Sequence, residues 1–301
     1  MPSPECHQPQ PEAQDPHQEA VDLSAEALAQ VEALAERLHL REQYFAQIKV
    51  LYQSGILENF PVTEKRPLPE QGITGINGEQ YVLPAYEDIL DRFKDQEKRE
   101  VIEKKTGQGF TKLLLVPFAM PFSVLITRYQ QFLLKTHQES GIKATDGSTL
   151  ELNTEDPLYV WEDLTQCDNP DTPKDKQIEY GVQNYDGKTK EARGGKYKDE
   201  LLKDPNNAWQ LLLLEDNPDL PAENKGKTTS NRKQLEANKS PKDYLKLLQE
   251  DPQYQNEAGL TPEAALTLYL THLQQEHIAI DDWSGKGKAN YLVGNYVSGG
   301  V

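Results

Sequence analysis

The amino-acid sequence predicts an α+β protein with a long N-terminal helix, a mixed α/β first half and a second α+β half. Three observations lead to this class. Apolar residues recur at helical spacing near the N-terminus, alternating β-forming segments flank Asn-Gly and Asp-Gly pairs, and two helices with Ser-Pro and Thr-Pro starts occur near the C-terminus. Together these patterns predict helices and short strands mixed along the whole chain.

The composition limits the partners that the chain can have. Its 49 acidic and 32 basic residues give a net charge of -17, which repels nucleic acid and anionic membrane surfaces. No apolar stretch has the roughly 20 residues of a membrane helix, and no secretory signal precedes the acidic start. Only Cys6 and Cys167 are present, so we expect no structural disulfide. These features predict a soluble, cytoplasmic protein.

The N-terminal part divides into a tail and a helix. Residues 1–22 are rich in proline and acids and almost lack large apolar side chains, which predicts a disordered tail. From residue 23 onward, apolar residues at helical spacing predict one long amphipathic helix as far as Gly55, within a helical arm of residues 23–60. Glu42 and Lys49 interrupt its heptad pattern, so we expect it to pack on the body of the protein. Self-association through this helix is the alternative.

Residues 61–138 are predicted to form a first α+β unit. A tight hairpin is centred on Asn77-Gly78, and a charged helix follows from about Tyr86 to Lys104. Residues 110–118 read as a buried strand. Pro121 then opens a helix whose apolar side chains share one face: Leu125, Tyr129, Phe132 and Leu133.

Residues 139–157 are rich in small and polar residues, and we interpret them as a linker to a second α+β unit, residues 158–301. Strands are predicted at residues 158–161 and around residues 178–182, the latter leading to a second hairpin turn at Asp186-Gly187. The four consecutive leucines within residues 209–215 are typical of a central strand.

Two helices follow in this second unit. Ser240-Pro241 and Thr261-Pro262 each combine an N-cap residue with a first-turn proline. The helix after Thr261 is expected to bury four side chains: Leu266, Tyr269, Leu270 and Leu273.

Motifs that resemble phosphate and metal sites are incomplete. Lys225-Gly226-Lys227-Thr228 lacks the first glycine of a phosphate-binding loop, because that position is Pro221. Asp219 and Glu223 have the residue types of a nuclease centre but lie in a proline-rich loop. His272 and His277 are five residues apart, one more than the zinc motif needs to place both on one helical face. We therefore predict no metal and no cofactor.

Nucleophilic catalysis has no better candidate. Cys167 is surrounded in sequence by Asp163, Asp168 and Asp171, which raise the pKa of a thiol and lower its reactivity. The sequence contains no Gly-x-Ser-x-Gly nucleophile turn. We therefore predict no catalytic residue.

Aromatic residues near the C-terminus are the candidate ligand-binding residues. Trp283, Tyr291 and Tyr296 stand among glycine, asparagine, serine and lysine, a composition typical of exposed recognition surfaces. The alternative is that these rings anchor glycine-rich turns to the core. Trp161 and Trp209 lie in apolar runs and are expected in the core.

Several segments together resemble a family of uncharacterised proteins from uncultivated bacteria of candidate phyla. The segments that carry the resemblance are residues 209–216, 224–228, 235–238, 244–245, 261–263 and 281–282. In that family a similar stretch precedes a C-type-lectin-like module of retroelement-diversified binding proteins. The resemblance, which spans residues 71–301 loosely, implies that the second half is an incomplete C-type-lectin-like domain that displays a ligand-binding surface. The Trp- and Arg-rich final segment of such a module is missing after Val301.

These patterns lead to two hypotheses about function. The first is a non-catalytic binding or interaction protein whose partner is a protein or a small ligand. The second is a metal-assisted hydrolase with a dispersed acidic active site, because 49 acidic residues offer many carboxylate pairs.

Overall fold

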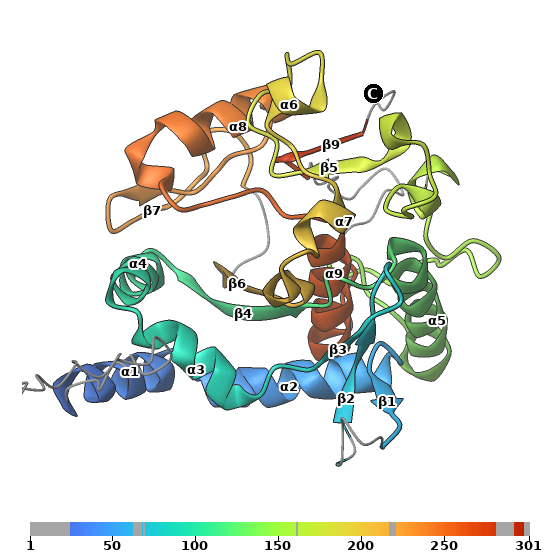
Figure 1. Cartoon of the computed structure of the whole chain (residues 1–301), viewed down its shortest axis with the longest axis horizontal. Helices are drawn as coiled ribbons and strands as arrows, with labels where there is room; N and C mark the ends of the chain where they lie inside the picture. Colours follow the sequence, from blue (N-terminus) through green and yellow to red (C-terminus); the bar gives the residue numbers. More distant parts are fainter. Residues whose placement is uncertain are drawn as a thin grey trace, which may run out of the picture.

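The computed structural model places a two-stranded antiparallel ribbon at the centre of the molecule, with helices packed around it (Figure 1). The structure describes residues 25–62, 68, 70–160, 162–216, 221–280 and 292–297. Helices and small antiparallel sheets alternate along these ranges, which confirms the mixed α+β class. No helix in the described ranges has the length and apolar character to cross a bilayer.

The N-terminal segment forms two helices, α1 (Ala25–Arg37) and α2 (Leu40–Gln53), so the prediction of one long helix was wrong. His39 between them adopts the left-handed conformation, with φ 46°. Leu38 and Leu40 are both fully buried. In a continuous helix two residues so spaced would point about 200° apart, so the break lets both side chains reach one core.

The expected hairpin at Asn77-Gly78 is confirmed. It joins β2 (Glu70–Thr74) to β3 (Gln80–Val82), with Thr74 opposite Gln80, and β1 (Glu58–Phe60) pairs with the other edge of β2. Gly78 has a positive φ, as the tight turn requires.

The predicted helix from Tyr86 to Lys104 is also divided, into α3 (Tyr86–Lys94) and α4 (Gln96–Gly107). Asp95 has an extended backbone, and its side chain accepts a hydrogen bond from the backbone N–H of Lys98 at the start of α4. Arg99 donates to the backbone oxygens of Phe93 and Lys94, which end α3. The break is thus capped on both sides.

The central ribbon consists of β4 (Phe110–Val116) and β6 (Gln210–Glu215), with Leu113 opposite Leu213. The last four residues of β4 are buried, whereas every residue of β6 is half-buried. Within the described part of the chain β6 pairs only with β4, so its predicted place as a central strand is wrong.

The other edge of β4 is covered by glutamines of α2. The side chain of Gln43 accepts from Leu113 N at 2.7 Å and donates to Thr111 O at 2.8 Å, and Gln47 accepts from Leu115 N at 3.4 Å. These amide groups take the place of a neighbouring strand.

Helices α2, α5 (Phe122–Ser140) and α9 (Pro262–Glu276) pack together against the core. The apolar faces expected for α5 and α9 are confirmed, and Tyr129 of α5 lies 6.4 Å from Tyr269 of α9 between ring centroids. Thr261 caps α9 as expected, and Ser240 caps α8 (Pro241–Glu250).

The strands of the second half pair differently from the prediction. Residues 158–160 form no strand, and Trp161 lies outside the described residues. β5 (Ile178–Tyr180) pairs with β9 (Asn295–Val297), and no hairpin forms at Asp186-Gly187. The chain after β5 instead returns through α6 (Lys190–Arg193), where Arg193 pairs with the buried Glu179.

Short elements complete the second half. They are η1 (Glu162–Gln166), η2 (Lys174–Lys176), α7 (Lys198–Leu201), η3 (Pro205–Ala208), η4 (Pro252–Tyr254), and the small hairpin of β7 (Thr228–Thr229) with β8 (Arg232–Lys233). One hydrophobic core extends from α1 to residue 280 and includes the buried Trp209, as expected. This core and the β4–β6 ribbon connect the two units that the sequence suggests on either side of residues 139–157.

Candidate functional site

A cavity of about 470 Å³ beside the central ribbon is lined by residues of α4, β4, β6 and α8 and by residues 256–260. We call it the apolar pocket. Its lining includes Val101 and Ile102 of α4, Leu248 of α8 and Leu211–Leu214 of β6. Most of its lining is aliphatic, which is typical of sites that bind small molecules.

The leucines of β6 explain why a cavity forms here. A strand of four consecutive leucines can bury both faces. One face of the ribbon packs against the helices of the core, but Leu211–Leu214 stay half-buried because they also line the cavity. The half-burial of such apolar side chains marks a surface that a ligand can cover.

One wall of the apolar pocket carries four charged side chains, which we call the Arg232 network: Lys105, Glu215, Arg232 and Glu257. Arg232 forms a two-pronged pair with Glu257, with both nitrogen–oxygen distances 2.7 Å, and also pairs with Glu215. Lys105 lies 2.5 Å from Glu257. Two cations and two carboxylates thus neutralise one another within the wall.

Aromatic rings hold the Arg232 network in place. The guanidinium carbon of Arg232 lies 4.6 Å from the ring centre of Phe110 and 5.5 Å from that of Tyr254. Burial alone would lower the pKa of Arg232, but the hydrogen bonds to Glu257 and the charges of Glu215 and Glu257 outweigh it and raise the pKa. The arginine therefore stays charged and paired.

A second group of charged residues is fully enclosed, and we call it the Lys198 cluster: Lys198, Asp168 and Glu263, with Tyr180. The Lys198 amine lies 2.5 Å from Asp168 and 2.7 Å from Glu263. Tyr180 donates to Glu263 at 2.7 Å, and Asp168 accepts from the backbone N–H of Phe122, the first residue of α5. The cluster joins α5, α7, β5 and α9 and has a structural role in holding them together.

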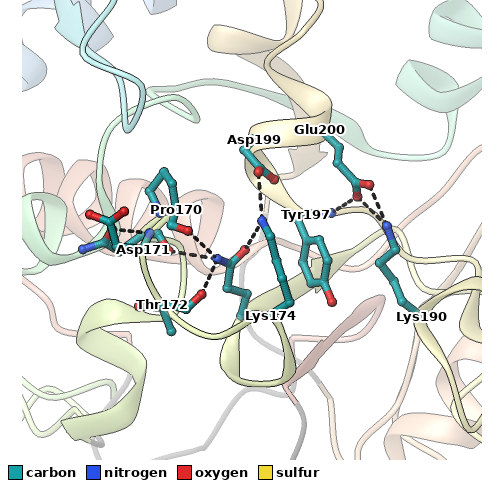
Figure 2. Close-up of polar contacts among 10 residues, drawn as sticks. Pro170, Asp171, Thr172, Lys174, Lys190, Tyr197, Asp199 and Glu200 are labelled. Carbon is teal, nitrogen blue, oxygen red and sulfur yellow. Dashed lines mark hydrogen bonds and ion pairs between the residues drawn. The ribbon is translucent and has the colours of Figure 1, made fainter.

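A partly exposed group of charged residues surrounds Tyr197 (Figure 2). Its ring lies between the amines of Lys174 and Lys190, which are 4.6 and 4.7 Å from the ring centre. Lys174 pairs with Asp199 at 2.8 Å and Lys190 with Glu200 at 2.6 Å. Dashed lines in Figure 2 mark both pairs. Each lysine thus has a carboxylate partner at the surface, where such pairs contribute little to stability.

The predicted ligand-binding residues lie away from the apolar pocket or outside the described part of the chain. Trp283 and Tyr291 fall outside the described residues. Tyr296, in β9, is half-buried, with the Arg193 guanidinium 4.1 Å from its ring centre and Tyr185 6.5 Å away. These contacts tie β9 to α6. A ligand-binding role for the three aromatic residues stays a prediction.

The incomplete motifs have ordinary structural surroundings where they are described. The backbone N–H of Gly226 donates to Glu236, and Thr228 begins a strand, so no helix follows to receive a phosphate. Asp219, of the proposed nuclease pair, lies outside the described residues. His277 ends α9 in the left-handed conformation, with its Nδ1 3.1 Å from the hydroxyl of Ser140. The described residues contain no group of three or more potential metal ligands.

The prediction that Cys167 is an unreactive thiol is supported by its surroundings. Burial, with the nearby charges of Asp168 and Glu263, raises the pKa of the thiol far above its usual value. Its sulfur also donates to the backbone oxygen of Leu164.

Sequence reasoning missed the charged wall of the apolar pocket. Lys105 carries one weak signal, because it follows Val101 by four residues and so lies on the same face of a helix. Arg232 and Glu257 lie in polar loops with no such spacing.

Comparisons with protein-family profiles, with curated proteins and with solved structures found no match. The resemblance to proteins with a C-type-lectin-like module therefore stays a prediction.

Proposed function

We propose that this chain is a non-catalytic binding protein whose ligand is a small, mostly apolar molecule held in the apolar pocket. The observation that carries this proposal is a cavity of about 470 Å³ with mostly aliphatic walls. The charged side chains on its remaining wall pair with one another. Cavities of about 300–1,000 Å³ commonly hold small ligands. A macromolecular partner would fit a broad surface better than a cavity of this kind.

The charges on the wall favour an uncharged ligand. A charged ligand would have to compete with Glu257 or Arg232 for partners that are already at 2.5 to 2.7 Å. An apolar body gains about 25 cal/mol for each Å² of surface removed from water and needs no such exchange. The net charge of -17 also supports a small ligand over nucleic acid.

The test is a fluorescence titration with Nile red, an uncharged dye whose emission rises in apolar surroundings. The wild-type chain should bind the dye, and Leu248→Trp should weaken binding by about tenfold or more because the indole fills the space between α8 and β6. Leu247→Trp is the matched control. Leu247 is half-buried on the same helix but does not line the apolar pocket.

The two variants separate pocket binding from general dye adsorption. Equal affinity in Leu248→Trp and Leu247→Trp would contradict the proposal, as would the absence of dye binding to the wild-type chain. Near-ultraviolet circular dichroism of both variants checks that the fold is retained.

A further inference from the structure

A second cavity, of about 380 Å³, lies where β4 meets the junction of α1 and α2 and the end of α9. We call it the polar pocket. Lys112 of β4 and His272 of α9 line it together with Arg37, His39, Asp216 and Glu276. Its lining is polar and charged, unlike that of the apolar pocket.

Two nitrogen groups in the polar pocket lack partners. The amine of Lys112 is half-buried and makes no hydrogen bond or ion pair with the described residues. In contrast, Lys105 and Lys198, the two buried lysines of the described ranges, each pair with a carboxylate. Nδ1 of His272 is also buried without a partner among the described residues. Polar groups left unpaired in a cavity mark a place where a ligand can supply the partner.

The surroundings also favour the uncharged forms of both groups. Burial lowers the pKa of Lys112, although the charges of Asp216 and Glu276 act in the opposite direction. Burial and then the charge of Lys112 lower the pKa of His272, against the effect of Glu276. An uncharged amine is a nucleophile, and an uncharged imidazole accepts a proton.

We propose that the polar pocket binds small 2-oxo acids covalently, through an imine with Lys112. The amine lone pair of Lys112 attacks the carbonyl carbon, a C–N bond forms, and the C=O electron pair moves to oxygen. The nitrogen then loses two protons, which the imidazole of His272 relays to the oxygen. The C–O bond breaks, water leaves, and the nitrogen lone pair forms the second C–N bond of the imine. No oxidant or reductant is consumed.

Among carbonyl compounds, 2-oxo acids fit the polar pocket best, because they carry a carboxylate that a cation of the pocket can bind. Arg37 lines the same pocket and has no ion pair with the described residues, so it is free to pair with a carboxylate. Asp216 and Glu276 also line the pocket, and their negative charges weaken non-covalent binding of an anion. A covalent bond to Lys112 would offset this repulsion. This site is separate from the apolar pocket, and its test does not depend on ligand binding there.

The test is borohydride trapping of the full chain with glyoxylate, followed by peptide mass mapping. We expect the labelled fraction at Lys112 to exceed that at any exposed lysine by about threefold or more, because a desolvated lysine is the better nucleophile. Mapping on the wild-type chain requires no variant to fold.

Variants identify the parts of the site. Lys112→Arg should remove the preferential label, and Lys143→Arg, at an exposed lysine, should leave it unchanged. Arg37→Gln should reduce labelling by glyoxylate more than labelling by propionaldehyde, which has no carboxylate. Uniform labelling of the lysines would overturn the proposal. Equal loss with both reagents in Arg37→Gln would overturn the assignment to 2-oxo acids.

Discussion

The Lys198 cluster and the Arg232 network contain the same kinds of side chain, but their surroundings differ. In the Lys198 cluster the three charged side chains are 0–2 % exposed and connect four elements of the core. In the Arg232 network Glu215 is 23 % exposed, and all four side chains line the apolar pocket. A buried ion pair can thus either close a core or form the wall of a cavity, depending on what packs beside it.

The net charges of the two groups also differ. The Lys198 cluster has one cation and two carboxylates, and Oε2 of Glu263 has no partner among the described residues. The Arg232 network has two of each. Loss of the cation should therefore be more damaging in the Lys198 cluster.

The largest effect is expected for Lys198→Met, which leaves Asp168 and Glu263 buried without their cation. Removing one partner of a buried pair costs about 3–5 kcal/mol of folding free energy. Urea unfolding followed by circular dichroism measures the loss. Glu263→Gln is the internal comparison and should cost less, because one carboxylate then balances Lys198.

A control variant at the surface completes this experiment. Lys174→Met breaks an ion pair with Asp199 whose side chains are 48 % and 38 % exposed, and should cost about 0–1 kcal/mol. A similar loss in Lys198→Met and Lys174→Met would refute the structural role of the Lys198 cluster.

A smaller effect is expected for Arg232→Met. Glu257 keeps its pair with Lys105, and water in the apolar pocket can hydrate Glu215, so we expect a loss of about 1–3 kcal/mol in urea unfolding. Nile red binding should persist in this variant, because the aliphatic walls remain. If Arg232→Met lost more unfolding free energy than Lys198→Met, the Arg232 network would be the more important of the two groups for stability, contrary to our expectation.

Local signals in the sequence predicted those elements whose formation depends on near neighbours. The hairpin at Asn77-Gly78, the strand β4, and the helices that begin after Pro121, Ser240 and Thr261 all formed as expected. In each case turn geometry, capping or a buried apolar run is decided within a few residues.

Elements that depend on distant partners were not predicted. The break at His39 follows from the need to bury both Leu38 and Leu40, which only the core reveals. β5 pairs with β9, which is distant in the sequence, whereas the nearby Asp186-Gly187 pair predicted a local hairpin.

The same distinction applies to the candidate sites. The run Leu211–Leu214 was recognised as a strand, but its partial exposure depends on which elements cover it. Lys112 and His272 come together only through packing of α9 near β4. Among so many charged residues, the sequence has no pattern that singles out Arg232 or Lys198.

The smallest effect should appear at alkaline pH, where Lys198 and Tyr180 lose their protons and Arg232 keeps its charge. Burial lowers the pKa of Lys198, but the charges and hydrogen bonds of Glu263 and Asp168 outweigh it and raise the pKa above 10.5. Burial, with the charge of Glu263, also raises the pKa of Tyr180 well above 10.0. The folded state therefore retains protons that the unfolded state releases.

This retention determines the sign of the pH effect. Tyr180 and Lys198 have ordinary pKa values of 10.0 and 10.5 in the unfolded chain. Their contribution to stability is complete below these values and is lost as the pH rises toward their higher pKa values in the folded state. The unfolding free energy of the wild-type chain should thus fall as the pH rises above about 10, and less steeply in Lys198→Met, which lacks one titrating group. Arg232 stays charged throughout this range, because the hydrogen bonds and charges of Glu257 and Glu215 raise its pKa above the ordinary value of a guanidinium. Arg232→Met should therefore reproduce the wild-type slope, and a flattened slope in that variant would assign the alkaline transition to the wall of the apolar pocket.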